Sequence, residues 1–235
     1  EAVDLSLRHL DTDYIDHYQV HFWDPETPLE ETLRALDDMV RQGKIRYIGC
    51  SNFAAWQLCR ALWISDKHGL ERFESVQPDY NFGRRHIETE LFPLCTEQQV
   101  SVIPFQVLMG GLLTGNYDHT KEPPGDSHLA SKHAGGAKKR YWNEAHFGMV
   151  DRLKSIATKT GHSPTQLALA WAFRPKSSPW KAGAAFGLLV IFILVTRLTE
   201  EKHACNHGDD GHGCNGQHGS LFVFCWLRLR LNWCR

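Results

Sequence analysis

The sequence lacks an excess of either charge. Its 26 Lys and Arg residues nearly balance 27 Asp and Glu residues, which gives a formal net charge of -1 at pH 7. No overall field of one sign would therefore draw the protein to nucleic acid or to an anionic membrane surface. Both partner classes are disfavoured on charge, and a small-molecule ligand is expected instead.

A long apolar run and a regular cysteine pattern are also missing. The longest uncharged apolar stretch, residues 182–195, is shorter than the roughly 18–20 residues that span a bilayer as a helix. The seven cysteines are odd in number and show no short paired spacing over the first two-thirds of the chain. This argues against a secreted disulfide framework and favours a reducing, cytoplasmic compartment.

The chain begins with Glu1 and shows no basic and apolar leader, so we expect its start to be a truncation. Its 235 residues suit one domain followed by a tail. We place the domain at residues 1–173. Residues 174–235 lose the earlier pattern, as a shifted reading frame or a retained intron would cause.

Strand-like and helix-like segments alternate within the domain. Short β-branched and aromatic runs predict strands, and apolar residues at helical spacing predict helices. Thr27, Pro28 and Glu30 have the pattern of an N-cap, a first helical residue and a capping box, and Gly43 ends that helix. The expected strands cover residues 14–22, 45–50, 75–80 and 100–105, and the expected helices cover residues 3–11, 28–42, 54–68 and 87–99.

The later part of the domain is less regular. Residues 116–148 are polar and lack clear periodicity, which indicates a functional lid or a disordered segment. Helical spacing resumes over residues 150–160. A second capping box, Ser163 to Gln166, opens a helix that runs through Trp171.

Polar or aromatic residues lie toward the C-terminal end of each expected strand. His21, Ser51 with Asn52, Gln77 and Phe105 recur at intervals of roughly 30 residues, about the length of one strand-and-helix unit. Such a period returns the chain to the same end of a parallel sheet, although an open doubly wound sheet would show the same alternation. In (β/α)₈ barrels, active sites lie at the carboxyl ends of the strands.

Four segments together resemble the aldo-keto reductase family in order and spacing. They are Tyr14–His21 (YIDHYQVH), Gly43–Phe53 (GKIRYIGCSNF), Val76–Asn81 (VQPDYN) and Gly110–Gly115 (GGLLTG). The resemblance covers about residues 1–173. It implies an α/β fold, the (β/α)₈ TIM barrel, of which this chain would hold about strands 4 to 7 with their helices.

The resemblance also implies an activity, which is hydride transfer between NADP(H) and the carbonyl of an aldehyde or ketone. His21 matches the residue that orients the carbonyl. Ser51, Asn52 and Gln77 match residues that hydrogen-bond the nicotinamide carboxamide, since hydroxyl and amide side chains can donate and accept. Phe105 matches the aromatic residue on which the nicotinamide stacks.

The same resemblance assigns Gln106, Leu108 and Gly110 to a loop along the cofactor pyrophosphate. Here Gln106 and Val107 replace the commoner Ser-Pro, and Asn116 stands where several members of the family carry a Lys. We therefore expect weaker binding of the cofactor phosphates. NADP is assigned by family habit, and NAD is the other option. The oligomeric state is not fixed by the sequence.

Several other interpretations stay open. The family's catalytic Asp, Tyr and Lys belong to units that would precede Glu1, so the chain alone is expected to be inactive. It could instead be a non-catalytic barrel relative or fragment that binds nucleotide as a regulatory subunit. Ser51 and Asn52 could only cap a helix, Phe105 could be core, and residues 138–140 read as a solvated loop rather than a phosphate contact. The His and Cys residues of the tail match no standard zinc spacing, so no metal is expected.

Overall fold

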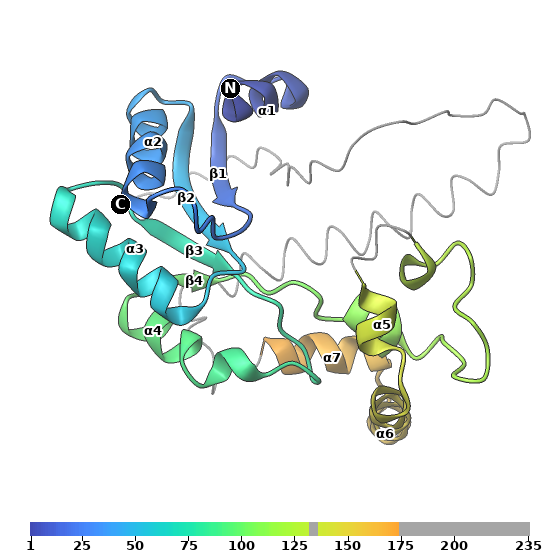
Figure 1. Ribbon diagram of the computed structural model, residues 1–235. Coiled ribbons are helices and arrows are strands. Elements are labelled where there is room, and N and C mark those ends of the chain that lie inside the picture. The colour runs from blue at the N-terminus through green and yellow to red at the C-terminus, as the bar shows by residue number, and fades with distance from the viewer. Residues whose placement is uncertain (132–135, 174–235) are drawn as a thin grey trace, which may run out of the picture.

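The computed structural model describes residues 1–131 and 136–173 (Figure 1). Its strands are β1 (Ile15–Val20), β2 (Ile45–Ser51), β3 (Phe73–Gln77) and β4 (Ser101–Val102). Its α-helices are α1 (Ala2–Leu10), α2 (Leu29–Arg41), α3 (Ala55–His68), α4 (Leu91–Glu97), α5 (Ala137–Tyr141), α6 (Glu144–Thr160) and α7 (Pro164–Ala172). Short 3₁₀ helices are η1 (His86–Glu88), η2 (Met109–Thr114) and η3 (His128–Ala130).

The strands form a four-stranded parallel sheet in the order β1-β2-β3-β4. A doubly wound sheet reverses its strand order at a switch point, whereas a barrel adds each new strand beside the last. The described strands follow the second rule, with a helix in each connection. The sheet is therefore an arc of consecutive βα units of a (β/α)₈ barrel, as expected.

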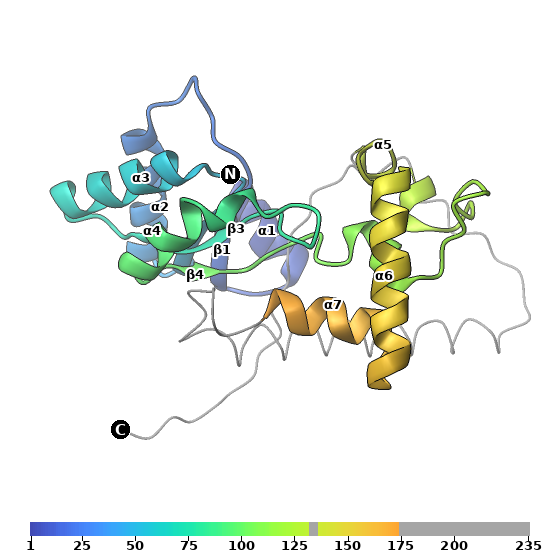
Figure 2. The ribbon, with the colours of Figure 1, turned by 90° about the horizontal axis from the view of Figure 1, so that it is seen from below.

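Helices α2, α3 and α4 cover one face of this sheet (Figures 1 and 2). The interface is apolar because Leu33, Ile48, Cys50 and Val76 are almost completely buried in one core cluster. Since side chains alternate along a strand, Gly49 and Ser51 point to the face opposite Cys50. The face away from the helices thus carries Ser51, at the last position of β2.

A second core joins η2, α5, α6 and α7. Helix α7 packs against both cores, because its Trp171 ring stacks on Tyr80 with ring centroids 5.1 Å apart while Ala168 lies in the second cluster. Ser163 accepts a hydrogen bond from the Gln166 amide, and Gln166 accepts one from the Ser163 amide, which confirms the predicted capping box.

Two expected elements are shorter because of proline. The helix expected over residues 87–99 is broken into η1 and α4, since Pro93 lacks an N–H and its ring clashes with a preceding helical carbonyl. Pro93 therefore lies in the first turn of α4. The strand expected over residues 100–105 is reduced to β4, because Pro104 cannot donate to a ladder. Phe105 pairs again, in an isolated bridge with Asp79.

One other local prediction was wrong. Thr27 does not cap α2, because Pro28 takes the N-cap position and Thr27 lies one residue before it. The Thr27 hydroxyl donates to Asp24 at 2.6 Å. Of the two alternatives for residues 116–148, disorder does not hold for the described residues, which include η3, α5 and the start of α6, whose N-cap Asn143 accepts from the His146 amide. A lid function of this segment stays a prediction. The expected tail, residues 174–235, lies outside the described residues. Among the described residues, no helix combines the length and apolar content needed to cross a membrane.

Candidate functional site

The sequence-predicted residues meet at one edge of the sheet. Ser51 and Gln77 are register partners at the last positions of β2 and β3, and His21 follows β1 directly. Val20 pairs with Cys50 one residue earlier, so His21 and Ser51 leave the sheet at the same level. Three consecutive strands thus deliver these side chains to one rim.

Asn52 ties this rim together. Its side-chain amide donates to the His21 carbonyl at 3.0 Å and to the Ser51 hydroxyl at 3.0 Å, and its backbone N–H donates to the Gln77 carbonyl at 3.1 Å. The backbone of Asn52 has φ 59°, a left-handed conformation that Asn adopts more readily than most residues. One residue in an unusual conformation therefore fixes the ends of β1, β2 and β3.

The hydrogen bonds at the rim leave specific groups available. Ser51 is buried and donates its hydroxyl proton to the Gln77 carbonyl at 2.9 Å, so it can only accept from a ligand. Within the described residues, the side-chain oxygen of Asn52 and the side-chain amide of Gln77 have no hydrogen-bond partner. The imidazole of His21 is exposed, with its ring centroid 4.1 Å from that of Phe22. The rim can thus offer an amide donor, amide acceptors and an imidazole.

Phe105 lies beside this rim on the next connection. Its N–H donates to the Pro78 carbonyl at 2.9 Å, and its carbonyl accepts from the Tyr80 N–H at 3.2 Å. Its side chain is half-buried, so it is neither fully core nor fully exposed. The backbone pairing holds Phe105 next to the segment that follows Gln77.

A tight loop follows Phe105. Gln106 has φ 58° and Gly110 has φ 67°, and a Cβ built on Gly110 would lie 2.7 Å from Leu129. The Leu108 carbonyl accepts from Gly111 at 3.0 Å, while its side chain packs against the second core. The Leu108 side chain therefore belongs to the edge of the second core, and Gly110 admits no larger residue without strain.

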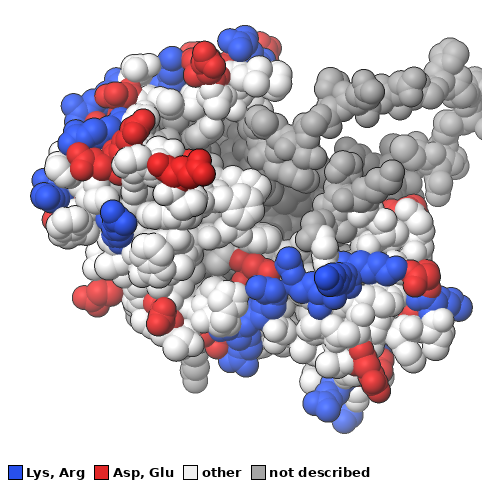
Figure 3. Space-filling model, in the orientation of Figure 1, with Lys and Arg blue, Asp and Glu red and all other residues white. Residues whose placement is uncertain are grey.

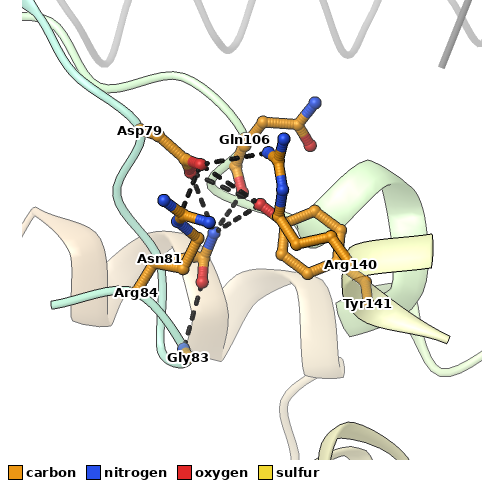
Figure 4. A network of polar contacts seen from close by, with 7 residues as sticks. All are labelled: Asp79, Asn81, Gly83, Arg84, Gln106, Arg140 and Tyr141. Carbon is orange, nitrogen blue, oxygen red and sulfur yellow. Dashed lines mark hydrogen bonds and ion pairs between the residues drawn. The ribbon is translucent and has the colours of Figure 1, made fainter. Parts of the chain in front are cut away.

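Sequence reasoning missed a polar network beside this loop (Figure 4). Asp79 is contacted by Arg84 at 2.9 Å and by Arg140 at 3.4 Å, and Asn81 donates to the Gln106 carbonyl at 3.1 Å. Burial raises the pKa of Asp79, and the nearby Arg84 and Arg140 charges oppose that rise. Asn81 belongs to a motif visible in the sequence, but no local signal links Asp79 to Arg140.

A second polar bridge lies close to the rim, two residues earlier along β1, β2 and β3. The side-chain amide of Gln19 donates to the Ser75 hydroxyl at 3.1 Å, and the Ser75 hydroxyl lies 2.8 Å from His17 Nε2. These contacts cross β2 at Gly49, which pairs in register with both Gln19 and Ser75. Burial lowers the pKa of His17, which favours the neutral ring that a Ser75 donor requires. The bridge joins β1 to β3 directly beneath the rim.

In the part of the chain that the structure describes, no group of three or more His, Cys, Asp or Glu side chains is arranged to hold a metal ion. The chemistry available at the rim is thus that of amides, a hydroxyl, an imidazole and glycine-rich backbone.

Comparisons with known proteins point to one family. The family description "Aldo/keto reductase family" matches residues 1–196. The versiconal hemiacetal acetate reductase of Aspergillus parasiticus is 36% identical over 172 residues, which cover 73% of this chain and 49% of that protein. A probable voltage-gated potassium channel subunit beta of Arabidopsis thaliana is 35% identical over 186 residues, covering 78% of this chain and 56% of that protein.

A solved structure, that of a glycerol dehydrogenase from Gluconobacter oxydans, is also similar. Its TM-score is 0.60 at 27% sequence identity, covering 76% of this chain and 51% of that one. The chain spans about half the length of the curated relatives that it matches. Because the family match extends over most of the sequence and includes every rim residue, this chain belongs to the aldo/keto reductase family.

Proposed function

We propose that the protein binds a nicotinamide dinucleotide, NADP(H) in the first place and NAD(H) in the second, and takes part in hydride transfer to the carbonyl of an aldehyde or ketone. The observation that carries the proposal is the junction at Asn52, which brings the ends of β1, β2 and β3 within hydrogen-bond distance of one another. Family membership supports the same reaction class.

The residues present fit this cofactor. A nicotinamide carboxamide carries one acceptor and one donor group, and the Asn52 oxygen and the Gln77 amide can meet both. Phe105 would offer a flat apolar face to the nicotinamide ring. Gly110 has φ 67° and no side chain, and glycine in such a loop lets the backbone approach a pyrophosphate closely.

His21 is the group that we assign to the carbonyl. The bound cofactor supplies the hydride, and the protein must then orient the carbonyl and stabilise the charge that develops on its oxygen. An exposed imidazole at the rim can donate an N–H to that oxygen. The resemblance assigns proton donation to a Tyr, tuned by a Lys and an Asp, at positions that precede Glu1 in the family pattern. For this reason we expect the chain alone to bind cofactor without turning over.

The similar reductase and the solved dehydrogenase are named for small-molecule chemistry, which supports a small carbonyl compound as the substrate. A cytoplasmic setting would supply the reduced cofactor. The potassium channel relative favours a second candidate function, in which the barrel binds nucleotide as a regulatory subunit. Both candidates require the same cofactor rim, and they differ only in turnover.

Cofactor binding is tested by titrating the full chain with NADPH and NADH while following quenching of its tryptophan fluorescence. We expect saturable binding that is weakened about tenfold by Gln77→Leu. The substitution removes one uncharged hydrogen bond and leaves the carboxamide group of the cofactor desolvated without a partner. A chain that unfolds cooperatively yet binds neither dinucleotide would overturn the proposal.

Turnover separates the two candidates. This chain, and any longer natural form that contains it, is assayed for oxidation of NADPH in the presence of an aldehyde. The reductase predicts carbonyl-dependent oxidation that His21→Ala reduces by about a hundredfold or more, within the range of general acid–base and electrostatic contributions. Tight NADPH binding with no oxidation would favour the regulatory subunit.

A further inference from the structure

Two guanidinium groups converge on a single oxygen atom of Asp79. Arg84 Nε lies 2.9 Å from Asp79 Oδ2, and Arg140 Nη1 lies 3.4 Å from the same atom. The Asp79 side chain is only 11% exposed, whereas those of Arg84 and Arg140 are 35% and 40% exposed. One carboxylate thus faces two cations, and the cluster carries an excess of one positive charge.

Neighbouring acidic groups are engaged elsewhere. Glu88 accepts from Arg85 in a two-pronged ion pair, and Glu122 pairs with Lys138. Figure 3 shows Lys and Arg side chains gathered in a band over α5 and beside it. The excess charge at Arg84 and Arg140 is therefore not cancelled by these carboxylates.

The cluster is fixed to the loop that begins at Gln106. Asn81 is completely buried, and its side-chain amide donates to the Gln106 carbonyl at 3.1 Å while its oxygen accepts from Gly83 at 3.0 Å. Tyr141, also buried, lies 3.4 Å from both Asn81 and Asp79 through its hydroxyl. These bonds hold the turn after β3, the loop and α5 together, with the cations at the surface of the junction (Figure 4).

Such a cluster has the properties of an anion site. The contacts with Asp79 engage Nε of Arg84 and Nη1 of Arg140, and each guanidinium carries further N–H donors. The long 3.4 Å contact leaves Arg140 free to turn toward a stronger acceptor. A phosphate would bridge the two cations and relieve their mutual repulsion.

We propose that Arg84 and Arg140 together bind a phosphate group of the dinucleotide beside the loop from Gln106 to Gly110. This inference rests on the proposed function, because it assumes that the dinucleotide occupies the rim. It adds a cationic contact from α5, a helix that lies outside the sheet and its rim. The same two residues would favour phosphorylated cofactors over unphosphorylated nicotinamide compounds.

In the competing account, Arg140 has only a structural role and holds α5 against Asp79. The two accounts predict different effects of replacing Arg140. If its role is structural, the affinity for every ligand of the rim falls alike, whereas loss of a phosphate contact lowers the affinity only for ligands that carry phosphate. Reduced nicotinamide riboside, which has no phosphate, is therefore the discriminating probe beside NADPH.

The test compares Arg140→Gln with Lys139→Gln in the full chain. Lys139 is an exposed neighbour on α5 that makes no ion pair within the described residues, so its substitution removes the same charge without touching Asp79. We expect Arg140→Gln to weaken NADPH binding by about 10- to 100-fold, the range for a lost hydrogen bond to a charged group. Binding of reduced nicotinamide riboside should be unchanged, and Lys139→Gln should change NADPH binding less than threefold or so.

Arg140→Lys keeps the positive charge but not the planar guanidinium group. It should therefore bind NADPH more tightly than Arg140→Gln and less tightly than the parent. Thermal melts of each variant show whether the fold is retained. Equal losses for Arg140→Gln and Lys139→Gln, or a parallel loss of riboside binding, would overturn the phosphate contact. If the unmodified chain binds neither NADPH nor the riboside, the proposed function itself fails, and this inference fails with it.

Discussion

Replacing Gly49 by alanine tests the polar bridge beneath the rim. Gly49 has ordinary backbone angles, so any cost of a side chain there must come from space rather than from backbone strain. A Cβ at this position would lie 2.5 Å from the Ser75 hydroxyl and 2.9 Å from the ring of His17. Both separations are shorter than carbon contacts allow, so at least one of the two side chains has to move.

The size of the effect follows from what that movement breaks. Overfilling a packed position costs about 1–3 kcal/mol. Displacing the Ser75 hydroxyl also breaks its contacts with His17 and Gln19, each with a net stabilising effect of about 1 kcal/mol. Because some of the strain is relieved when these contacts are lost, we expect Gly49→Ala to lower the free energy of unfolding by about 2–4 kcal/mol.

The assay is urea-induced unfolding followed by tryptophan fluorescence, with the slope against urea checked for constancy. Gly148→Ala is the matched control, since Gly148 lies inside α6 at an exposed position with nothing near its would-be Cβ. Alanine there should stabilise the helix by about 0.5–1 kcal/mol. Adding Ser75→Ala to Gly49→Ala removes the closest clash, so the double variant should be less destabilised than the sum of the single ones.

A stability of Gly49→Ala within about 0.5 kcal/mol of the parent would refute the reasoning, because it would mean that the space at β2 is not occupied as described. Strictly additive effects of Gly49→Ala and Ser75→Ala would refute the narrower point that the serine hydroxyl is the obstacle.

Three further predictions concern other parts of the chain. Burial holds the pKa of His17 below its ordinary value of 6.5, so the unfolded state binds a proton at a higher pH than the folded state does. The free energy of unfolding therefore falls as the pH drops below about 6.5. The urea midpoints at about pH 7.5 and about pH 5.5 should differ less in His17→Gln than in the parent. Ser163→Ala removes the acceptor for the Gln166 amide and should lower the free energy of urea unfolding by about 1 kcal/mol, whereas Ser163→Asp should keep most of it. Asn52→Gly preserves the left-handed backbone but deletes the amide, so NADPH titration should show about tenfold weaker binding, and unchanged affinity would count against a cofactor role for Asn52.

Local signals in the sequence determined the repeated strand-and-helix units and the capping box at Ser163. Hydrophobic periodicity and capping chemistry act over a few residues, and a parallel sheet turns that regularity into a shared rim. This is why the sequence alone predicts that His21, Ser51 and Gln77 lie at one edge of the sheet. The order of the strands, which distinguishes a barrel from a doubly wound sheet, could not be read in this way.

Only the tertiary structure decided the contacts between distant segments. Asp79 meets Arg140, and His17 reaches Ser75 across Gly49, because the fold superimposes elements that are far apart along the chain. The backbone geometry also decided where α2 begins, since Pro28 rather than Thr27 takes the N-cap position. Sequence patterns report the preferences of neighbours along the chain, whereas the partner of a buried or charged side chain depends on which surfaces the packed fold brings together.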